Sequence, residues 1–321
     1  MQPRIDTNLG IEGDPDAWVH SACILCSNGC GVDIAVKDGR IAGVRGNAGH
    51  PVNFGHLGPK GEHGWVANNS KRRGTTPMIR RTKGASLEPV GWAEAMDFFI
   101  ETFREAWRQG HENLACYNSG QLTIEEFYTL GKLWRGGLQS SNIDGNTRLC
   151  TATSATGLMA NFGVDGPVAS YVDVDQADLL CLYGHNVAEV QTVLWERMLA
   201  AKAKNGGRII VADPRRTPTV LQGADLHLAL RSGTNVALMN GIIHLLIARG
   251  WIDRDFIARH TVGFDELDAV AREYPPERVA EICGIPRRDL ETAAEWIGTT
   301  RRMVSTVLQG FYQSVEATAS S

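Results

Sequence analysis

Three cysteines near the N-terminus are the residues whose spacing most directly indicates chemistry. Cys23, Cys26 and Cys30 follow a C-x2-C-x3-C pattern, so one tight loop can point several sulfurs at a single centre. Thiolates at this spacing bind iron–sulfur clusters or zinc, and both groups normally take four ligands. Unrelated buried thiols would not be expected to fall within 8 residues. The sequence therefore predicts a metal site, and the spacing leaves both kinds open.

The residues that follow the cysteines predict the element that positions them. Alternating runs at 32–36 and 40–44 are joined by Lys37-Asp38-Gly39. This pattern is typical of a β-hairpin with an Asp-Gly turn, and Gly29 and Gly31 allow the chain to bend sharply beside Cys30. A small β-rich module that holds a cluster is expected here.

Composition limits the kind of protein. A length of 321 residues favours a small metal module plus a larger body. The net charge of −4 argues against bulk nucleic-acid binding or a membrane-surface role. No apolar run reaches transmembrane length, and the first twenty residues show neither a signal-peptide core nor a twin-arginine leader. We therefore expect a cytoplasmic protein without membrane insertion, whose clustered thiols bind metal rather than form disulfides.

The body of the chain predicts an α/β architecture. An irregular connector at 66–90 precedes a helix at 93–107, a short strand at 114–117 and a helix with a capping-box start at Thr123. The apolar run 179–183, a helix to about Ala203 and a strand at 208–212 form a β–α–β unit, which implies a parallel sheet with a right-handed crossover. Further elements are expected as helices at 236–247, 254–259, 265–273 and 287–296 and as a strand at 303–308.

In a doubly wound parallel sheet, ligands bind beyond the carboxyl ends of the strands. Three segments leave such ends, at 118–121, 183–186 and 213–217. They supply small residues, amides and cations, which suit phosphates and the edges of heterocycles. Neither G-x-G-x-x-G nor G-x-x-x-x-G-K-[ST] occurs, which argues against an ordinary Rossmann or P-loop site.

Taken in order, these motifs resemble one known family. They are the cysteine knuckle, the L-x-P-K-G segment at 57–61, N-I-D-x-N-x-R-x-C at 142–150, the strand ending in G-x-N-x-A-E, A-D-P-R-R-T at 212–217 and G-A-D-L-H-L at 223–228. The chain is similar to the N-terminal half of the prokaryotic molybdopterin oxidoreductases that carry a bis-molybdopterin guanine dinucleotide molybdenum cofactor. The similarity is greatest to assimilatory and periplasmic nitrate reductases, with formate dehydrogenases close behind.

The resemblance implies a division of the chain and a set of metal ligands. It implies a [4Fe-4S] domain at 16–72 and a molybdopterin oxidoreductase core at 73–321 that is incomplete at its C-terminus. The cluster would be held by Cys23, Cys26 and Cys30, and Lys60 would lie between cluster and pterin and assist electron transfer. Cys150 would ligate molybdenum.

The resemblance also implies contacts to the rest of the cofactor. Two amides, Gln121 and Asn146, match residues that contact it. The guanine dinucleotide would be bound by two loops, at 183–190 and 213–218, together with Asp225. Within these loops the candidate residues are Tyr183, Gly184, His185, Asn186, Glu189, Asp213, Pro214, Arg215 and Arg216.

Two features depart from the family pattern. The fourth cluster cysteine aligns with Gly58, so the site would hold a [3Fe-4S] cluster, recruit His56 or His63, or have lost the cluster. The chain also ends at Ser321, inside an expected helix, whereas family members continue. A truncated and catalytically silent binding module is therefore an alternative to an enzyme.

The resemblance implies reduction of nitrate to nitrite, with electrons entering through the cluster. Thr151-Ala152-Thr153 follows Cys150, whereas formate dehydrogenases usually place a histidine soon after their cysteine or selenocysteine. Formate dehydrogenase is the alternative activity. The expected partners are a small-anion substrate and an electron donor, either ferredoxin, flavodoxin or an NADH-linked reductase.

Overall fold

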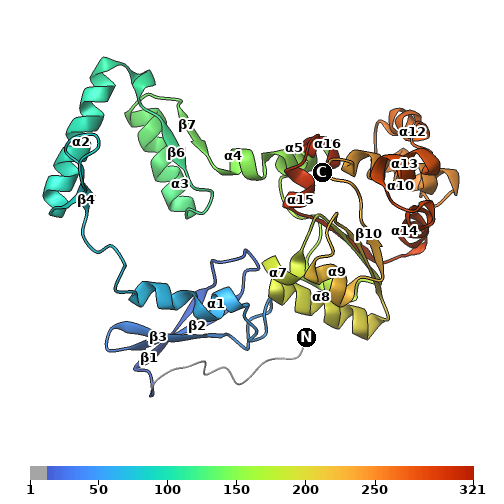
Figure 1. The fold of residues 1–321 in the computed structure, drawn as a ribbon, viewed down its shortest axis with the longest axis horizontal. Coiled ribbons are helices and arrows are strands. Elements are labelled where there is room, and N and C mark those ends of the chain that lie inside the picture. The colour runs from blue at the N-terminus through green and yellow to red at the C-terminus, as the bar shows by residue number, and fades with distance from the viewer. Residues whose placement is uncertain (1–12) are drawn as a thin grey trace. The chain divides into compact units, whose positions relative to one another are not determined.

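The computed structural model describes residues 13–321, which separate into two compact units. The described residues up to Asn68 pack with Thr153–Ser321 as the first unit, and Asn69–Ala152 form the second. Each unit is described by itself. Figure 1 shows the order of the elements along the chain. The two units are a division by packing, in which the N-terminal segment packs with the end of the chain, and the predicted division at residues 72 and 73 stays a prediction.

The first unit begins with a small antiparallel sheet in the order β1-β2-β3. Its elements are β1 (Ala17–Ala22), β2 (Gly31–Lys37) and β3 (Arg40–Gly46), followed by α1 (Pro59–His63) and the 3-10 helix η1 (Gly64–Asn69). The predicted hairpin is confirmed: β2 pairs with β3, and Asp38 and Gly39 both adopt positive φ in the turn. Strand β1 was not predicted, because most of its side chains are exposed and carry no apolar alternation.

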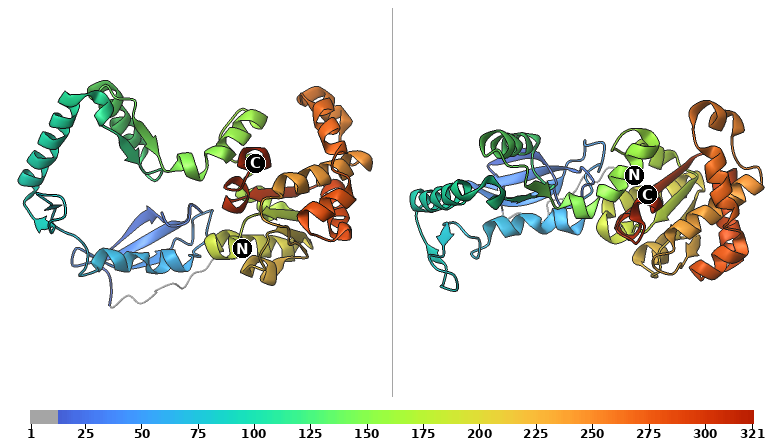
Figure 2. Two further views of the ribbon diagram at one scale, coloured as in Figure 1. Left: turned by 45° about the horizontal axis from the view of Figure 1, so that its top comes forward. Right: turned by 90° about the horizontal axis from the view of Figure 1, so that it is seen from above.

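The larger part of the first unit is a parallel sheet in the order β10-β9-β8-β11, visible edge-on in Figure 2. Its strands are β8 (Leu179–Tyr183), β9 (Arg208–Ala212), β10 (Leu226–Leu228) and β11 (Met303–Val307). The helices of this part are α5 (Ala152–Phe162), α6 (Tyr171–Gln176), α7 (Val187–Val190), α8 (Thr192–Asn205), α9 (Pro218–Gly223), α10 (Asn235–Ala248), α11 (Arg254–His260), α12 (Phe264–Arg272), α13 (Pro276–Cys283), α14 (Arg287–Thr299), α15 (Gln309–Tyr312) and α16 (Ala317–Ser320).

Alternate residues of the central strands bury themselves in two different cores. Leu179, Cys181 and Tyr183 of β8 face one core, which includes residues of α10, α13 and α14. Leu180 and Leu182 face the other, which includes residues of α6 and α8. A strand covered on both faces reads as a continuous apolar run, which is why the sequence indicated β8 so clearly. The predicted α/β fold, with a β-rich module followed by a parallel sheet, is confirmed.

The second unit contains two short strand pairs and several helices. The pairs are β4 (Met78–Ile79) with β5 (Glu88–Pro89), antiparallel, and β6 (Cys116–Asn118) with β7 (Ile143–Gly145), parallel. The helical elements are α2 (Trp92–Gln109), the 3-10 helix η2 (His111–Asn113), α3 (Ile124–Gly131), the π-helix η3 (Lys132–Gly137) and α4 (Thr147–Cys150). The predicted capping box at the start of α3 is present, since Thr123 and Glu126 bond each other's backbone N–H groups.

Candidate functional site

The three N-terminal cysteines lie in one loop that connects β1 to β2. The loop is closed at its base by a hydrogen bond from Cys23 N to Cys30 O of 2.9 Å. Within it, Ser27 and Gly29 adopt left-handed backbone conformations, with φ of 57° and 76°. These two left-handed residues let the chain reverse direction twice between Cys23 and Cys30.

Cys30 is the most buried of the three thiols, and Cys23 and Cys26 are half-buried. Burial, with a smaller contribution from the like charges of Cys23 and Cys26, raises the pKa of the Cys30 thiol to about 12. The start of α1 lies against the same loop, because a Cβ built on Gly61 would be 3.3 Å from Cys23 Sγ. We call the loop 23–30 together with residues 57–61 the cysteine cradle.

Asn53 holds the segment that leads to residues 57–61, the second part of the cradle. Its side chain is fully buried, accepts from Gly31 N at 2.9 Å and donates to Gly31 O at 3.0 Å. It also donates to His56 O at 2.8 Å. One amide therefore ties the start of β2 to the segment that leads into Gly58, so the two halves of the cradle are held in register.

Asn28 provides a test of whether the cradle suits a cluster. The residue is 3% exposed and lies between Cys26 and Cys30. Neither its side-chain nitrogen nor its side-chain oxygen has a hydrogen-bond partner among residues 13–321. Buried amides are rarely left unpaired, and a cluster sulfide would accept from the nitrogen. The loop thus offers three thiolates and an unpaired donor, which fit an iron–sulfur cluster, whereas Gly58 offers no fourth ligand.

The remaining predicted or alternative ligands lie around the start of α1. Lys60 is exposed on α1 and directly precedes Gly61, the residue closest to Cys23. His56 Nδ1 lies 2.8 Å from Glu196 Oε2, and His63 is exposed at the end of α1. Within the part of the chain that the structure describes, no set of three or more His, Cys, Asp or Glu side chains is arranged to hold a single metal ion.

Arg197 of α8 joins the β-rich module to the parallel-sheet part of the same unit. It is 4% exposed and forms a bidentate ion pair with Asp175, with both contacts at 2.6 Å. It also donates to the carbonyls of Pro51 and Val52 at 3.0 and 2.9 Å. Sequence analysis missed this residue, because an arginine on an amphipathic helix usually lies on the solvent face.

A cavity of about 700 Å³ opens beyond the carboxyl ends of β8, β9, β10 and β11. We call it the strand-end pocket. This is the edge at which a parallel sheet binds ligands, as the sequence predicted. Its lining includes the predicted residues Gly184, Asn186, Glu189, Asp213, Pro214 and Arg215.

The polar groups of the pocket are held in place by short hydrogen bonds. Asp213, 5% exposed, accepts from Arg215 N at 2.8 Å. The side-chain Oδ1 of Asn186 accepts from Thr219 Oγ1 at 2.9 Å, and its Nδ2 donates to the carboxylate of Glu189. Gly184, at φ 57°, passes so close to Gly310 that a Cβ would lie 2.6 Å from a backbone atom. Any side chain at this position would push into the pocket wall.

Four predicted dinucleotide residues do not line the pocket. Tyr183 is buried in the core, and Arg216 is exposed beside the lining residue Arg215. Asp225 lies at the opposite edge of the sheet, where it accepts from Ile209 N at 2.7 Å and pairs with Lys202 at 2.7 Å. His185 is the fourth. Their contacts with a cofactor stay predictions.

His185 is a buried residue between two residues that line the pocket. It is 3% exposed, with Nδ1 2.8 Å from Thr306 Oγ1 and Nε2 2.8 Å from Gln191 Oε1. Burial lowers the pKa of His185 to about 4, against the opposing hydrogen bond to Gln191. The ring is therefore neutral at pH 7, which suits a role in holding Gly184 and Asn186 on either side of it.

Several pocket residues were not predicted from sequence. Arg231, Ser232 and Asn235 follow β10, and residues 308–310 and 313–315 follow β11. The same strand-end rule would have found them, since each segment directly follows a strand of the sheet. The short strand β10 was not recognised, so the segment after it was not examined. Arg231 and Arg215 give the pocket two cations of the kind that bind phosphate.

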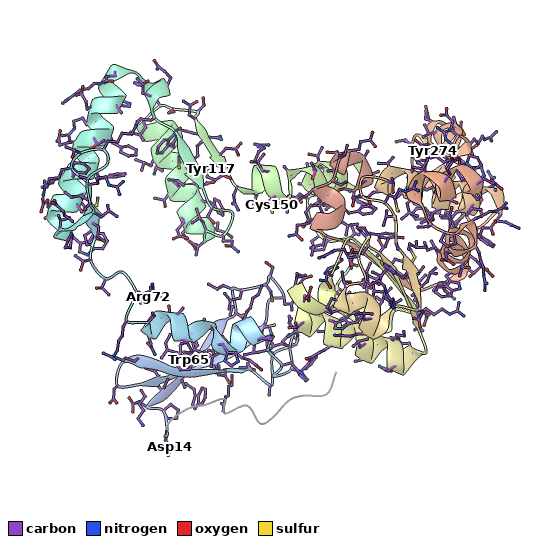
Figure 3. The ribbon with its side chains drawn as sticks, viewed as in Figure 1. Asp14, Trp65, Arg72, Tyr117, Cys150 and Tyr274 are labelled. Carbon is purple, nitrogen blue, oxygen red and sulfur yellow. The ribbon has the colours of Figure 1, made fainter. Side chains whose placement is uncertain are left out.

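Cys150 lies in the second unit, where Figure 3 labels it. It is half-buried and ends the short helix α4, two residues before α5 begins. In the same unit, Gly120 N donates to Asn146 Oδ1 at 2.6 Å, which brings the two predicted amide segments together, with Gln121 exposed beside them. Cys181 and Cys283 of the first unit are instead fully buried core residues.

Fold and site together define a protein with a parallel sheet, a pocket at the carboxyl ends of its strands and a three-cysteine loop on a small β-rich module. Residues 73–314 match the family model of molybdopterin oxidoreductases, and residues 16–70 match the Fe4S4 domain of molybdopterin oxidoreductases. The chain belongs to the molybdopterin oxidoreductase family. These matches support a molybdenum–pterin cofactor and an iron–sulfur cluster as the groups that the residues serve.

Individual relatives within the family have different named activities. The chain is 37% identical to the periplasmic nitrate reductase of Desulfovibrio desulfuricans, over 96% of this chain and 42% of the relative. It is 34% identical to the F420-dependent formate dehydrogenase subunit alpha of Methanocaldococcus jannaschii, over 88% of this chain and 41% of the relative. The solved structure of acetylene hydratase from Pelobacter acetylenicus matches with a TM-score of 0.82 and 25% identity, covering 94% of this chain and 42% of that one.

The chain spans about two fifths of the length of the curated relatives it matches. Among residues 13–321, no helix is both long enough and apolar enough to cross a bilayer.

Proposed function

We propose that this chain belongs to a molybdenum-dependent oxidoreductase that reduces nitrate to nitrite. The observation that carries the proposal is the segment Cys150-Thr151-Ala152-Thr153. Formate dehydrogenases usually place a histidine soon after the corresponding cysteine or selenocysteine, and this segment has none. The 37% identity to a periplasmic nitrate reductase supports the same choice. Bound molybdenum would supply the oxygen-atom transfer, and nitrate would be converted to nitrite and water with two electrons and two protons.

The proposed cofactor is the bis-guanine dinucleotide form. The strand-end pocket supports it, because Arg215 and Arg231 are cations suited to a diphosphate, and Asp213 and Asn186 offer acceptors and a donor for the edge of a purine. Cys150 would be the thiolate ligand of molybdenum. The cysteine cradle and Lys60 would form the route by which electrons enter.

The proposed electron donor is a ferredoxin, a flavodoxin or an NADH-linked reductase. The cytoplasm is the proposed compartment, where clustered thiols stay reduced. A periplasmic location is the competing proposal, since the Desulfovibrio relative is named for that compartment. Fractionation of cells by osmotic shock, followed by immunodetection of the chain, separates the two.

Formate oxidation is the second candidate function, favoured by the 34% identity to a formate dehydrogenase subunit. The test is to assay the purified, cofactor-loaded protein for nitrate-dependent oxidation of reduced methyl viologen and for formate-dependent reduction of the oxidised dye. We expect activity with nitrate, abolished in Cys150→Ala and retained in the matched variant Cys116→Ala. Activity with formate alone would overturn the proposal. No activity with either substrate, in protein shown to contain molybdenum, would favour the binding-module alternative.

A further inference from the structure

Gly58 and Thr192 lie directly opposite each other at the edge of the cysteine cradle. A Cβ built on Gly58 would be 2.4 Å from Thr192 Oγ1 and 3.8 Å from Thr192 Cβ. Contacts of a Cβ below 3.0 Å are essentially never seen in proteins. A side chain at position 58 and the hydroxyl at position 192, as it stands, therefore exclude each other.

Packing and hydrogen bonds hold the rest of the cradle together. Cys30, Leu57 and Val193 share one small buried core, and Asn53 holds the segment before Gly58 against β2. Tyr171 donates from its hydroxyl to Asn28 O at 2.6 Å, which secures the loop from the side of α6. The missing side chain at position 58 is thus a local change in a site whose other parts are in place.

The side chains near Gly58 that could replace a fourth cysteine as ligand are two histidines and one hydroxyl. His56 is already paired with Glu196, and His63 is exposed at the far end of α1. The hydroxyl of Thr192 is partly buried and has no hydrogen-bond partner among residues 13–321. A neutral hydroxyl is a much poorer ligand for the iron of a cluster than a soft thiolate.

We propose that Gly58 and Thr192 are a matched pair that leaves one corner of the cluster without a protein ligand, so that the three cysteines hold a [3Fe-4S] cluster. A fourth iron at that corner would face only a hydroxyl and solvent, and it would be lost readily. The inference deepens the proposed electron-entry role, but its readouts are metal content and spectra, so it stands or fails independently of nitrate turnover.

The open corner has a defined chemistry. An oxidised [3Fe-4S]⁺ cluster that takes one electron from dithionite and binds one Fe²⁺ becomes [4Fe-4S]²⁺, so iron and charge both balance. A chelator such as EDTA, followed by reoxidation with ferricyanide, removes the added iron and that electron again. With a fourth thiolate in place, the same treatment should leave the cluster intact.

The experiment uses the full 321-residue chain, reconstituted anaerobically with iron and sulfide, as wild type, Thr192→Ala, Gly58→Cys and the double variant. Iron, acid-labile sulfide and low-temperature electron paramagnetic resonance are measured, and circular dichroism checks folding. We expect about three irons per four sulfides and the signal of an oxidised three-iron cluster in wild type and in Thr192→Ala. Gly58→Cys alone should gain little iron, because its Cβ meets the hydroxyl. The double variant should reach about four irons and lose the signal.

Each other result overturns the proposal. Wild type with four irons that resist EDTA would show that the fourth corner has a ligand, and wild type without iron would show that the site is lost. A full fourth iron in Gly58→Cys alone would show that Thr192 does not block the position. Should the double variant misfold, reversible uptake of Fe²⁺ by reduced wild type decides the matter, and failure to take up iron would contradict an open corner.

Discussion

The cysteine cradle and the strand-end pocket lie on the two sides of one short segment, yet we expect them to respond very differently to substitution. Val190 lines the pocket, whereas Thr192, two residues later, faces Gly58 at the cradle. The polar groups of the pocket are spread over four strand ends, so we expect that no single group is indispensable for binding. The cradle would bind through one sulfur from each of three cysteines, so each ligand should matter, and Gly58 contributes no ligating atom.

The sharpest way to test this contrast is to remove one more ligand from the cradle. Cys26→Ser should reduce the iron bound by the reconstituted chain at least tenfold, because two remaining thiolates cannot hold a cluster. Iron analysis and the visible absorption of the cluster would measure the loss. Cys116→Ser in the second unit is the matched control and should keep the wild-type iron content. Retention of iron in Cys26→Ser would show that the cysteine loop is not the metal site.

The next largest effect is expected at Arg197, the residue that joins the β-rich module to the parallel-sheet part of the first unit. Arg197→Met leaves Asp175 without its partner and two carbonyls without their donor. Removing one member of a fully buried ion pair costs about 3–5 kcal/mol. Because the Asp175 side chain is 37% exposed, we expect the free energy of unfolding to fall by about 3 kcal/mol, the low end of that range. Urea unfolding monitored by tryptophan fluorescence gives the number.

Arg272→Met is the control for this change, since Arg272 pairs with Asp268 on the surface and little effect is expected there. The opposite result, with Arg197→Met as stable as wild type, would mean that the β-rich module does not depend on this contact for its attachment.

Acid should lower the free energy of unfolding, because the buried ring of His185 becomes protonated when the chain unfolds. Its folded-state pKa of about 4 lies below the ordinary 6.5, so the unfolded chain binds the proton more strongly. The stability that the neutral ring provides is complete above pH 6.5 and is lost as the pH falls toward 4. The loss from this group should reach about 3 kcal/mol at pH 4.

Urea unfolding at several pH values between 7 and 4 would test this, with His185→Gln as the comparison. The variant should be less stable at pH 7 but should lose stability less steeply on acidification, because the titrating ring is gone. Equal slopes for the two proteins would rule out His185 as the source of acid sensitivity.

Sequence reasoning succeeded where local signals and tertiary structure agree. The apolar run of β8, the Asp38-Gly39 turn and the capping box at Thr123 each carry their structure within a few residues. The pocket was predicted at the correct edge because strand direction alone determines where strand ends meet.

The parts that sequence did not reveal depend on contacts between distant residues. Nothing in the helix around Arg197 indicates that its guanidinium is buried against Pro51 and Val52. The opposition of Gly58 and Thr192 likewise exists only after the module has packed on α8. The resemblance grouped Asp225 with the loops of the pocket, whereas its side chain bonds Ile209 at the start of β9. A residue that is close in sequence to the pocket-lining loops can therefore lie at the opposite end of the sheet.

The smallest expected effect concerns two adjacent arginines and asks whether the pocket really spreads its binding over many groups. Arg215 lines the pocket and Arg216 does not. Arg215→Ala should weaken binding of GDP, used as a probe, by about tenfold, the loss expected for one charge-assisted contact to phosphate. Arg216→Ala should bind as wild type does. Isothermal titration calorimetry would measure both. Because Arg231 still supplies a cation in the Arg215 variant, binding should persist; its complete loss would mean that the pocket depends on single groups as the cradle does.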